Sequence, residues 1–246
     1  MKLKLTIPSD LSEISLKQYN KFLKIQENNE DSYFLQCKMI EIFCNLDLES
    51  VRLLKLTDAD RIVNILNKMF ESKPQLIRTF KLSGIEYGII PNLDEISLGE
   101  YVDLDTYMGD WENMHIAMNV LYRPIKEKIG DKYLIKEYDV DAKDKIEEIP
   151  MDVVFGAIFF FVQFRDRLIK GYDGLFGGSS DGRLDGSANF SRKYGWYQSI
   201  FSALAQNDVR RLEDITKLNV HKCLYALEYM KEKSELEANQ IKKNFK

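Results

Sequence analysis

Apolar residues recur every three to four positions along most of this chain, which is the spacing of amphipathic helices. Runs in which polar and apolar residues alternate, as in a half-buried strand, are short and few. The helical spacing predicts helices beginning at Leu16, over Phe34–Phe43, over Asp47–Leu56, from Thr57 or Asp58 to before Pro74, over Trp111–Tyr122, Pro150–Lys170, Trp196–Ala205 and Val209–Thr216, and from Val220 onward. The strand-like runs are Lys2–Ile7, Thr79–Leu82 continuing to Ile90, and Lys132–Tyr138. The pattern therefore predicts a mainly α-helical protein with a few short β-strands and a bundle-like C-terminal part.

A nine-residue stretch occurs twice. Residues 11–19 read Leu-Ser-Glu-Ile-Ser-Leu-Lys-Gln-Tyr and residues 93–101 read Leu-Asp-Glu-Ile-Ser-Leu-Gly-Glu-Tyr, so six of nine positions are identical. Each copy follows an Ile-Pro pair that ends a strand-like run. Ser15 and Ser97 are placed to cap a helix, because a serine oxygen can accept from the free N–H groups of the first turn. We expect both copies to adopt the same turn-into-helix conformation with their apolar positions buried.

The repeat and the glycines divide the chain. Residues 1–149 form an N-terminal portion that holds the two strand–Pro–helix copies, near 2–45 and 79–123. Residues 150–246 form a helical C-terminal portion, interrupted at 171–195 by a Gly/Ser-rich loop that contains seven of the 13 glycines. Residues 173–190 should be poorly packed, because Gly-rich polar sequence buries too little to offset the entropy of ordering.

Composition is ordinary for a soluble globular protein, with 45% apolar and 30% charged residues. The net charge of −4 is uneven: residues from Ser187 onward hold 11 Lys/Arg against 7 Asp/Glu, and the rest holds 24 against 32. Three cysteines make no disulfide framework, and Cys37 and Cys44 are expected to face a helix core. The most apolar run, Met151–Val162, is shorter than the roughly 20 residues of a membrane span, and no secretory signal is recognisable.

No arrangement of reactive residues stands out. The two histidines, His115 and His221, have no His or Cys at helical ligand spacing and are expected to be surface or packing residues. The acidic runs beginning at Asp103 and Asp139 place unsuitable residues where a calcium loop needs oxygen ligands and glycine. The Gly-rich run 177–183 lacks the Gly-Lys-Ser/Thr of a phosphate-binding loop. We therefore predict no catalytic, cofactor-binding or metal-binding residues, and a protein that is not an enzyme.

A DNA-binding protein is the alternative. Residues 208–233 have the layout of a helix-turn-helix, with a short helix, a tight turn and a second helix. Arg210, Arg211, Lys217 and Lys222 could contact phosphates, whereas Glu228, Glu232 and Glu235 on the second helix oppose this.

Several segments together resemble a family. They are the stretch from Ile90 through the second copy to Asp105, then Trp111, Met118–Pro124, Pro150–Phe161, and the ending from Gly195 to Leu224. They resemble uncharacterised proteins of tailed bacteriophages, and the ending is similar to the C-terminal region of tail-assembly chaperones and baseplate-hub-associated proteins. The resemblance implies a tail assembly factor or minor virion structural protein that acts by protein–protein contacts. It implies other tail or baseplate proteins as partners, and the host cytoplasm during assembly as the location, with retention in the virion and self-association left open.

The last helix is expected to bury Val220, Cys223, Leu224, Leu227 and Met230, and to become polar from Lys231 onward. Three apolar residues remain in that polar end, five and four positions apart, and could form a narrow contact seam. The predicted partner-binding residues are these three and the two apolar residues of the Gly-rich loop, namely Leu236, Ile241, Phe245, Leu175 and Phe176.

Overall fold

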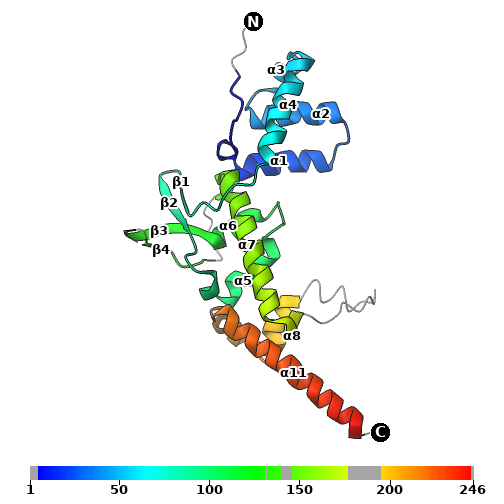
Figure 1. The fold of residues 1–246 in the computed structure, drawn as a ribbon, viewed down its shortest axis with the longest axis vertical. Coiled ribbons are helices and arrows are strands. Elements are labelled where there is room, and N and C mark those ends of the chain that lie inside the picture. Colours follow the sequence, from blue (N-terminus) through cyan, green and yellow to red (C-terminus); the bar gives the residue numbers. More distant parts are fainter. Residues whose placement is uncertain (1–4, 131, 140–145, 177–194, 245–246) are drawn as a thin grey trace. The chain divides into compact units, whose positions relative to one another are not determined.

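The computed structural model describes residues 5–130, 132–139, 146–176 and 195–244 (Figure 1). It is mainly helical with one four-stranded antiparallel sheet, which confirms the predicted fold class. The chain forms two compact units. Unit 1 comprises residues 1–90 and 107–161, and unit 2 comprises residues 91–106 and 162–246. This division differs from the expected boundary at Pro150, because the second copy of the repeat groups with the C-terminal residues.

Unit 1 begins with helical elements whose bounds are η1 (Leu11–Glu13), α1 (Leu16–Glu27), α2 (Ser32–Phe43), α3 (Leu48–Arg52) and α4 (Leu56–Phe70). An aromatic cluster joins them: the Tyr19 ring lies 5.5 Å from Phe70 and 4.9 Å from Trp111, measured between centroids. Cys37 and Cys44 are buried, as predicted. The helices are thus held by their apolar faces, which the 3.6-residue spacing made recognisable.

The sheet of unit 1 runs in the order β1 (Thr79–Leu82), β2 (Ile85–Ile89), β3 (Tyr122–Ile129) and β4 (Lys132–Ile135), all antiparallel (Figure 1). α6 (Met114–Leu121) leads directly into β3, where the sequence pattern predicted only the end of a helix. Gly88 on β2 is required by packing, because a Cβ there would lie 2.5 Å from the Tyr133 ring.

Of the expected strand Lys2–Ile7, the described residues Leu5–Ile7 belong to no strand, and residues 1–4 lie outside the described residues. An alternating pattern becomes a strand only when a neighbour accepts and donates its backbone hydrogen bonds, and the sheet pairs β1 to β4 with one another. Within the described residues, a strand, β2, precedes the second copy and none precedes the first.

Both copies of the repeat adopt the same conformation, as predicted. Each consists of a single 3₁₀ turn, η1 or η2 (Leu93–Glu95), two connecting residues, and a helix, α1 or the shorter α5 (Leu98–Tyr107). The Ser15 N–H donates to Gln18 Oε1 (3.0 Å) and the Gln18 N–H donates to Ser15 Oγ (3.3 Å). Ser97 and Glu100 make the same reciprocal pair, at 2.7 and 3.2 Å. These are capping boxes, which satisfy two free donors at each helix start.

The apolar positions of the two copies are buried in parallel. Ile14 and Ile96 precede the caps and are 1% and 2% exposed, and Leu16 and Leu98 are fully buried. Tyr101 is buried and Tyr19 is half-buried. The residue before the cap and the tyrosine after it occupy the positions that form a hydrophobic staple. The prediction for both caps and for these apolar positions is confirmed.

Each copy is also hydrogen bonded to the start of a second helix. In the first clasp, Ile14–Leu16 lies antiparallel to residues 149–151: the Leu16 N–H donates to Ile149 O and the Met151 N–H donates to Ile14 O, both at 2.9 Å. In the second clasp, Ile96–Leu98 lies antiparallel to residues 218–220: the Leu98 N–H donates to Leu218 O (2.7 Å) and the Val220 N–H donates to Ile96 O (3.0 Å). Pro150 faces Ser15, and Asn219 faces Ser97.

The segments that complete the clasps carry the apolar spacing of the repeat itself. Apolar residues stand at the first, fourth, sixth and ninth positions in Ile146, Ile149, Met151 and Val154, and again in Ile215, Leu218, Val220 and Cys223. Each copy of the repeat is thus paired with a segment of the same apolar spacing that leads into a long helix, α7 or α11. The first clasp lies in unit 1 and the second in unit 2.

Further helical elements are η3 (Ile146–Glu148), α7 (Met151–Gly171), α8 (Asp173–Phe176), η4 (Ser199–Leu204, a π-helix), η5 (Val209–Arg211), α10 (Leu212–Thr216) and α11 (Val220–Asn244). The predicted core helix after Pro150 is therefore present as α7. In the part of the chain that the structure describes, no helix is both long and apolar enough to span a bilayer.

Candidate partner-binding surface

α8 falls within the predicted Gly/Ser-rich loop and packs against α11. Leu175 and Phe176 are half-buried there. The Lys231 ammonium donates to Leu175 O (3.3 Å), and a Cβ on Gly174 would lie 2.8 Å from Glu228 Oε1. The first residues of the loop are therefore a helical turn on α11, where poor packing was predicted. The rest of the predicted loop, residues 177–194, lies outside the described residues.

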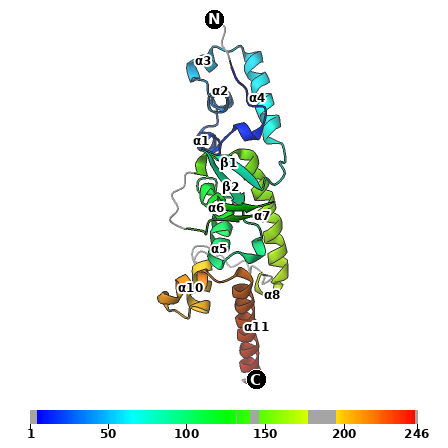
Figure 2. The same cartoon turned by 90° about the vertical axis from the view of Figure 1, so that its left-hand side faces the viewer.

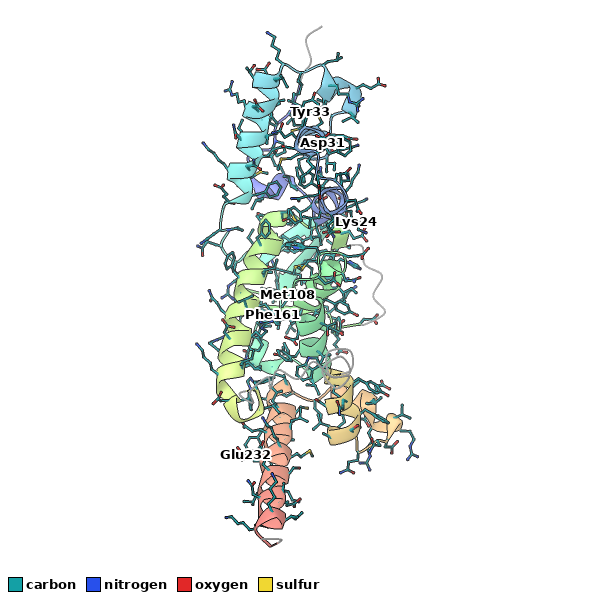
Figure 3. The ribbon with its side chains drawn as sticks, turned by 90° about the vertical axis from the view of Figure 1, so that its right-hand side faces the viewer. Lys24, Asp31, Tyr33, Met108, Phe161 and Glu232 are labelled. Carbon is teal, nitrogen blue, oxygen red and sulfur yellow. The ribbon has the colours of Figure 1, made fainter. Side chains whose placement is uncertain are left out.

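α11 continues far beyond its packed part. Val220, Cys223, Leu224 and Leu227 are buried as predicted, whereas Met230 is 37% exposed and its predicted burial is wrong. Every residue from 232 to 243 is exposed, and Glu232 marks the beginning of this length in Figure 3. Figures 1 and 2 both show α11 running past α8 toward the C-terminus. We call residues 232–243 the α11 extension.

The predicted contact residues of the tail lie on different sides of this helix. Leu236 and Ile241 are 60% and 56% exposed. Five residues turn an α-helix by about 140°, so the two side chains do not form one stripe. Phe245 lies outside the described residues. The structure thus places Leu236 and Ile241 on the α11 extension, places Leu175 and Phe176 on α8 beside the packed part of α11, and does not bring the four together as one patch.

Two tyrosines that the sequence reading did not single out share a side of α11 with Leu236. Tyr225 is 69% exposed and Tyr229 is 60% exposed. Residues 225, 229 and 236 are four and seven positions apart, which keeps them within about 40° of one another around the helix. We call these three residues the tyrosine face. The spacing of these three residues is visible in the sequence. The sequence does not show which side of α11 is buried, and so it could not show that these residues are exposed.

A cleft of about 450 Å³ lies beside this face, between the end of α7 and the start of α11. Its lining includes Phe164, Leu168, Arg167, Tyr172, Asp94, His221, Tyr225 and Glu228. The Tyr172 hydroxyl lies 2.9 Å from His221 Nδ1, and His221 Nε2 lies 3.3 Å from Asp94 Oδ1. Both contacts are satisfied when the Tyr172 hydroxyl donates to Nδ1 and the proton on Nε2 is donated to the carboxylate.

The Tyr172 hydroxyl also lies 3.2 Å from His221 O, which can accept from it. Burial, and secondarily the Glu228 carboxylate, raise the pKa of Tyr172, so its hydroxyl keeps its proton at neutral pH. His221 was predicted to be a surface or packing residue, and it is partly exposed and packs against the Tyr172 ring. Its side chain also connects Tyr172, the residue after α7, to Asp94 of η2. Sequence spacing could not indicate this, because the three residues are far apart along the chain.

A second polar contact fixes the segment before η4. Trp196 Nε1–H donates to Asp105 Oδ2 (3.0 Å), and the Trp196 ring stands edge-on to Tyr101 with centroids 5.6 Å apart. Arg165 Nη1 lies 3.8 Å from the other Asp105 oxygen. Burial, followed by the Asp105 charge, raises the pKa of Tyr101. Tyr101 and Asp105 of α5 thus anchor the segment that precedes η4.

The basic residues of the alternative, DNA-binding reading mostly contact acids. Arg210 Nη2 lies 2.9 Å from Asp208 Oδ2, and Lys217 Nζ lies 2.6 Å from Glu213 Oε1. Arg211 Nε lies 3.8 Å from the same Asp208 oxygen. The turn before α11 is also held in the second clasp. These surface pairs are weak and solvent-exposed, and they lower the net positive charge that η5, α10 and the turn would present to phosphates.

Among the residues that the structure describes, no three His, Cys, Asp or Glu side chains come together as a metal site would need. The Asp110 carboxylate, from one of the two acidic runs, instead accepts from the Glu112 N–H (3.1 Å) and from Asn113 Nδ2 (2.8 Å). Comparison of the chain with protein-family models, with curated proteins and with solved structures finds no match.

Proposed function

We propose that this chain is a bacteriophage tail assembly factor or minor virion structural protein, and that it acts by protein–protein contacts and not by catalysis. The observation that carries the proposal is the α11 extension. A helix segment of this length is marginal on its own in water, and helices in proteins gain most of their stability by packing an apolar side. Leu236 and Ile241 are exposed on two sides of the extension, so it offers apolar surface to another chain.

The two clasps support the same proposal. They hold α1 to α7 and α5 to α11 through backbone hydrogen bonds and buried apolar residues. Such a scaffold presents a long helix, α11, whose extension is exposed to other chains. The resemblance of the second copy and of the ending to tailed-phage proteins suggests the partners: other tail or baseplate polypeptides, met in the host cytoplasm during assembly.

Truncation tests the proposal. A tagged full chain and a tagged chain that ends at Lys231 are expressed in infected cells, and the co-purifying proteins are identified by mass spectrometry at moderate salt. The full chain should enrich tail or baseplate proteins, and the truncated chain should not. Its melting temperature should be nearly unchanged, because residues 232–243 are exposed. A large loss of thermal stability would mean that the extension packs on its own chain, and would contradict the proposal.

The same preparation discriminates the DNA-binding alternative. Binding to phosphates releases counterions, so affinity for non-specific DNA falls steeply as salt rises. Retention of DNA with that salt dependence, without tail proteins, would favour residues 208–233 as a nucleic-acid surface. Glu235→Gln is the matched control for co-purification, because Glu235 is also exposed on the extension but lies about 100° or more around the helix from both Leu236 and Ile241. This variant should leave co-purification intact.

A further inference from the structure

The tyrosine face is an apolar surface on a helix that this chain does not cover. Tyr225, Tyr229 and Leu236 are each at least 60% exposed and lie within about 40° of one another. Exposed tyrosines gathered on one side of a rigid element are typical of protein interfaces, where they supply large contact area at a small cost in side-chain entropy.

The spacing on this face is that of two helices packed side by side. Positions 225, 229, 232, 236, 239 and 243 alternate steps of four and three, which is the repeat of a coiled-coil contact line. Glu232, Asn239 and Lys243 occupy the remaining positions of the line. The identity and sign of these residues restrict which partner helix can lie opposite.

A second copy in parallel orientation would place like charges together. It would set Glu232 against Glu232 and Lys243 against Lys243 along the contact line, and like charges in direct contact oppose association. A second copy in antiparallel orientation, centred near residue 234, instead sets Lys243 of one chain against the Tyr225 ring of the other. It also sets the aliphatic part of Glu232 against Leu236.

Two further effects favour the antiparallel orientation. Lys243 over the Tyr225 ring is a cation–π contact, which adds to the apolar contact. The charge of α11 also changes along its length: residues 228–237 hold four Glu and two Lys, whereas residues 238–243 hold two Lys and no acid. Antiparallel helices bring the acidic part of one copy beside the basic end of the other. Their helix dipoles also point in opposite directions, which is the favourable side-by-side arrangement.

We propose that the tyrosine face pairs with the tyrosine face of a second copy of this chain, with the two α11 helices antiparallel. The overlap of residues 225–243 is about 28 Å long. Because each copy contributes three apolar residues, the dimer is a reversible, concentration-dependent one. This inference goes beyond the proposed function, and it is tested on purified chain alone, so its failure leaves the co-purification test untouched.

Sedimentation equilibrium of the purified full chain, from micromolar to submillimolar concentration, is the main test. The weight-average mass should rise from monomer toward dimer. Leu236→Asp should lower the association constant by at least about tenfold, the equivalent of 1.4 kcal/mol. Ile241→Asp is the matched control, because Ile241 is 56% exposed on the same extension but lies about 140° away, and it should leave the association constant unchanged.

Orientation is tested by cross-linking. Differently tagged Tyr229→Cys and Asn239→Cys chains, mixed and oxidised, should form the mixed disulfide in preference to the Tyr229→Cys homodimer, since these positions face each other only in the antiparallel pair. A monomer at every concentration would overturn the proposal, as would equal weakening by Leu236→Asp and Ile241→Asp. Preferential Tyr229→Cys homodimers would overturn the antiparallel arrangement. Both aspartate variants change exposed positions, and an unchanged melting temperature verifies that they fold.

Discussion

Proline at residue 219 should be tolerated by the second clasp, whereas proline at residue 220 should break it. The clasp uses the N–H groups of Leu98 and Val220, and not that of Asn219. The first clasp already has a proline, Pro150, at the position equivalent to Asn219. The usual preference is the reverse, because residue 220 is the first residue of α11, where proline is favoured.

The expected magnitudes follow from the contacts that each change removes. Asn219→Pro removes the Nδ2–H donated to Asp94 O (2.8 Å) and the Oδ1 that accepts from the His221 N–H (3.0 Å). A lost cap costs about 1 kcal/mol and a lost neutral hydrogen bond about as much. Restriction of the unfolded chain by proline returns roughly 0.4–1 kcal/mol. The net loss should be about 1–1.5 kcal/mol.

Val220→Pro should cost more. It removes the N–H that donates to Ile96 O at 3.0 Å and places a ring carbon toward that oxygen. A buried carbonyl left without its donor costs about 1–3 kcal/mol, and displacement of the clasp adds to this. We expect about 3 kcal/mol or more, which is at least about tenfold beyond Asn219→Pro in the unfolding equilibrium constant.

The two tryptophans allow each unit to be followed separately. Trp196 contacts Tyr101 in unit 2 and Trp111 contacts Tyr19 in unit 1. In a Trp111→Phe background, urea unfolding followed by fluorescence therefore reports unit 2. Pro150→Asn is the reciprocal control in the first clasp, measured in a Trp196→Phe background in which fluorescence reports unit 1. It should lower the free energy of unfolding of unit 1 by less than Val220→Pro lowers that of unit 2. Equal losses from Asn219→Pro and Val220→Pro would refute the clasp account.

Three further outcomes are expected. Burial, and then the Asp10 charge, raise the pKa of Asp152 above the ordinary 3.8. The stability that protonated Asp152 contributes is therefore complete below pH 3.8 and is lost as pH rises through the folded-state pKa. Asp152→Asn should have a higher melting temperature than wild type at pH 7 and the same one at acidic pH, and equal melting temperatures at both pH values would contradict this. Burial raises the pKa of the Cys44 thiol to about 11. A thiol reagent at pH 8 should therefore label Cys44 only after unfolding, as followed by peptide mass spectrometry. Rapid labelling of Cys44 in the folded protein would contradict this prediction. Gly99→Ala should not raise stability by the roughly 1 kcal/mol that helix propensity alone would give, because the new Cβ would lie 3.2 Å from both Cβ and O of Thr216. A gain in the free energy of unfolding, measured by Trp196 fluorescence in urea, would contradict this reasoning.

The features that the sequence predicted well are local ones. A cap and its partner three residues later lie on one turn, so Ser15 and Ser97 could be assigned without tertiary information. The apolar faces of the helices and the burial of Ile14, Leu16 and Leu98 follow from the 3.6-residue spacing in the same way. These elements agree with the structure because their determinants lie within a few residues of one another.

The features that the sequence did not reveal depend on distant residues. The clasps join segments more than a hundred residues apart through backbone atoms, and Pro150 and Asn219 share no side-chain chemistry. β3 contains Pro124 and follows α6 without a loop, so its strand character comes from its neighbours β2 and β4. The same holds for the candidate surface: exposure of Tyr225 and Tyr229 depends on which side of α11 is covered.

Co-purification from infected cells tests the central claim most directly. With the full chain as bait, the account predicts enrichment of tail or baseplate proteins, and loss of that enrichment in the chain ending at Lys231 at an unchanged melting temperature. Enrichment of no such protein by the full chain, or equal enrichment by the truncated chain, would contradict it.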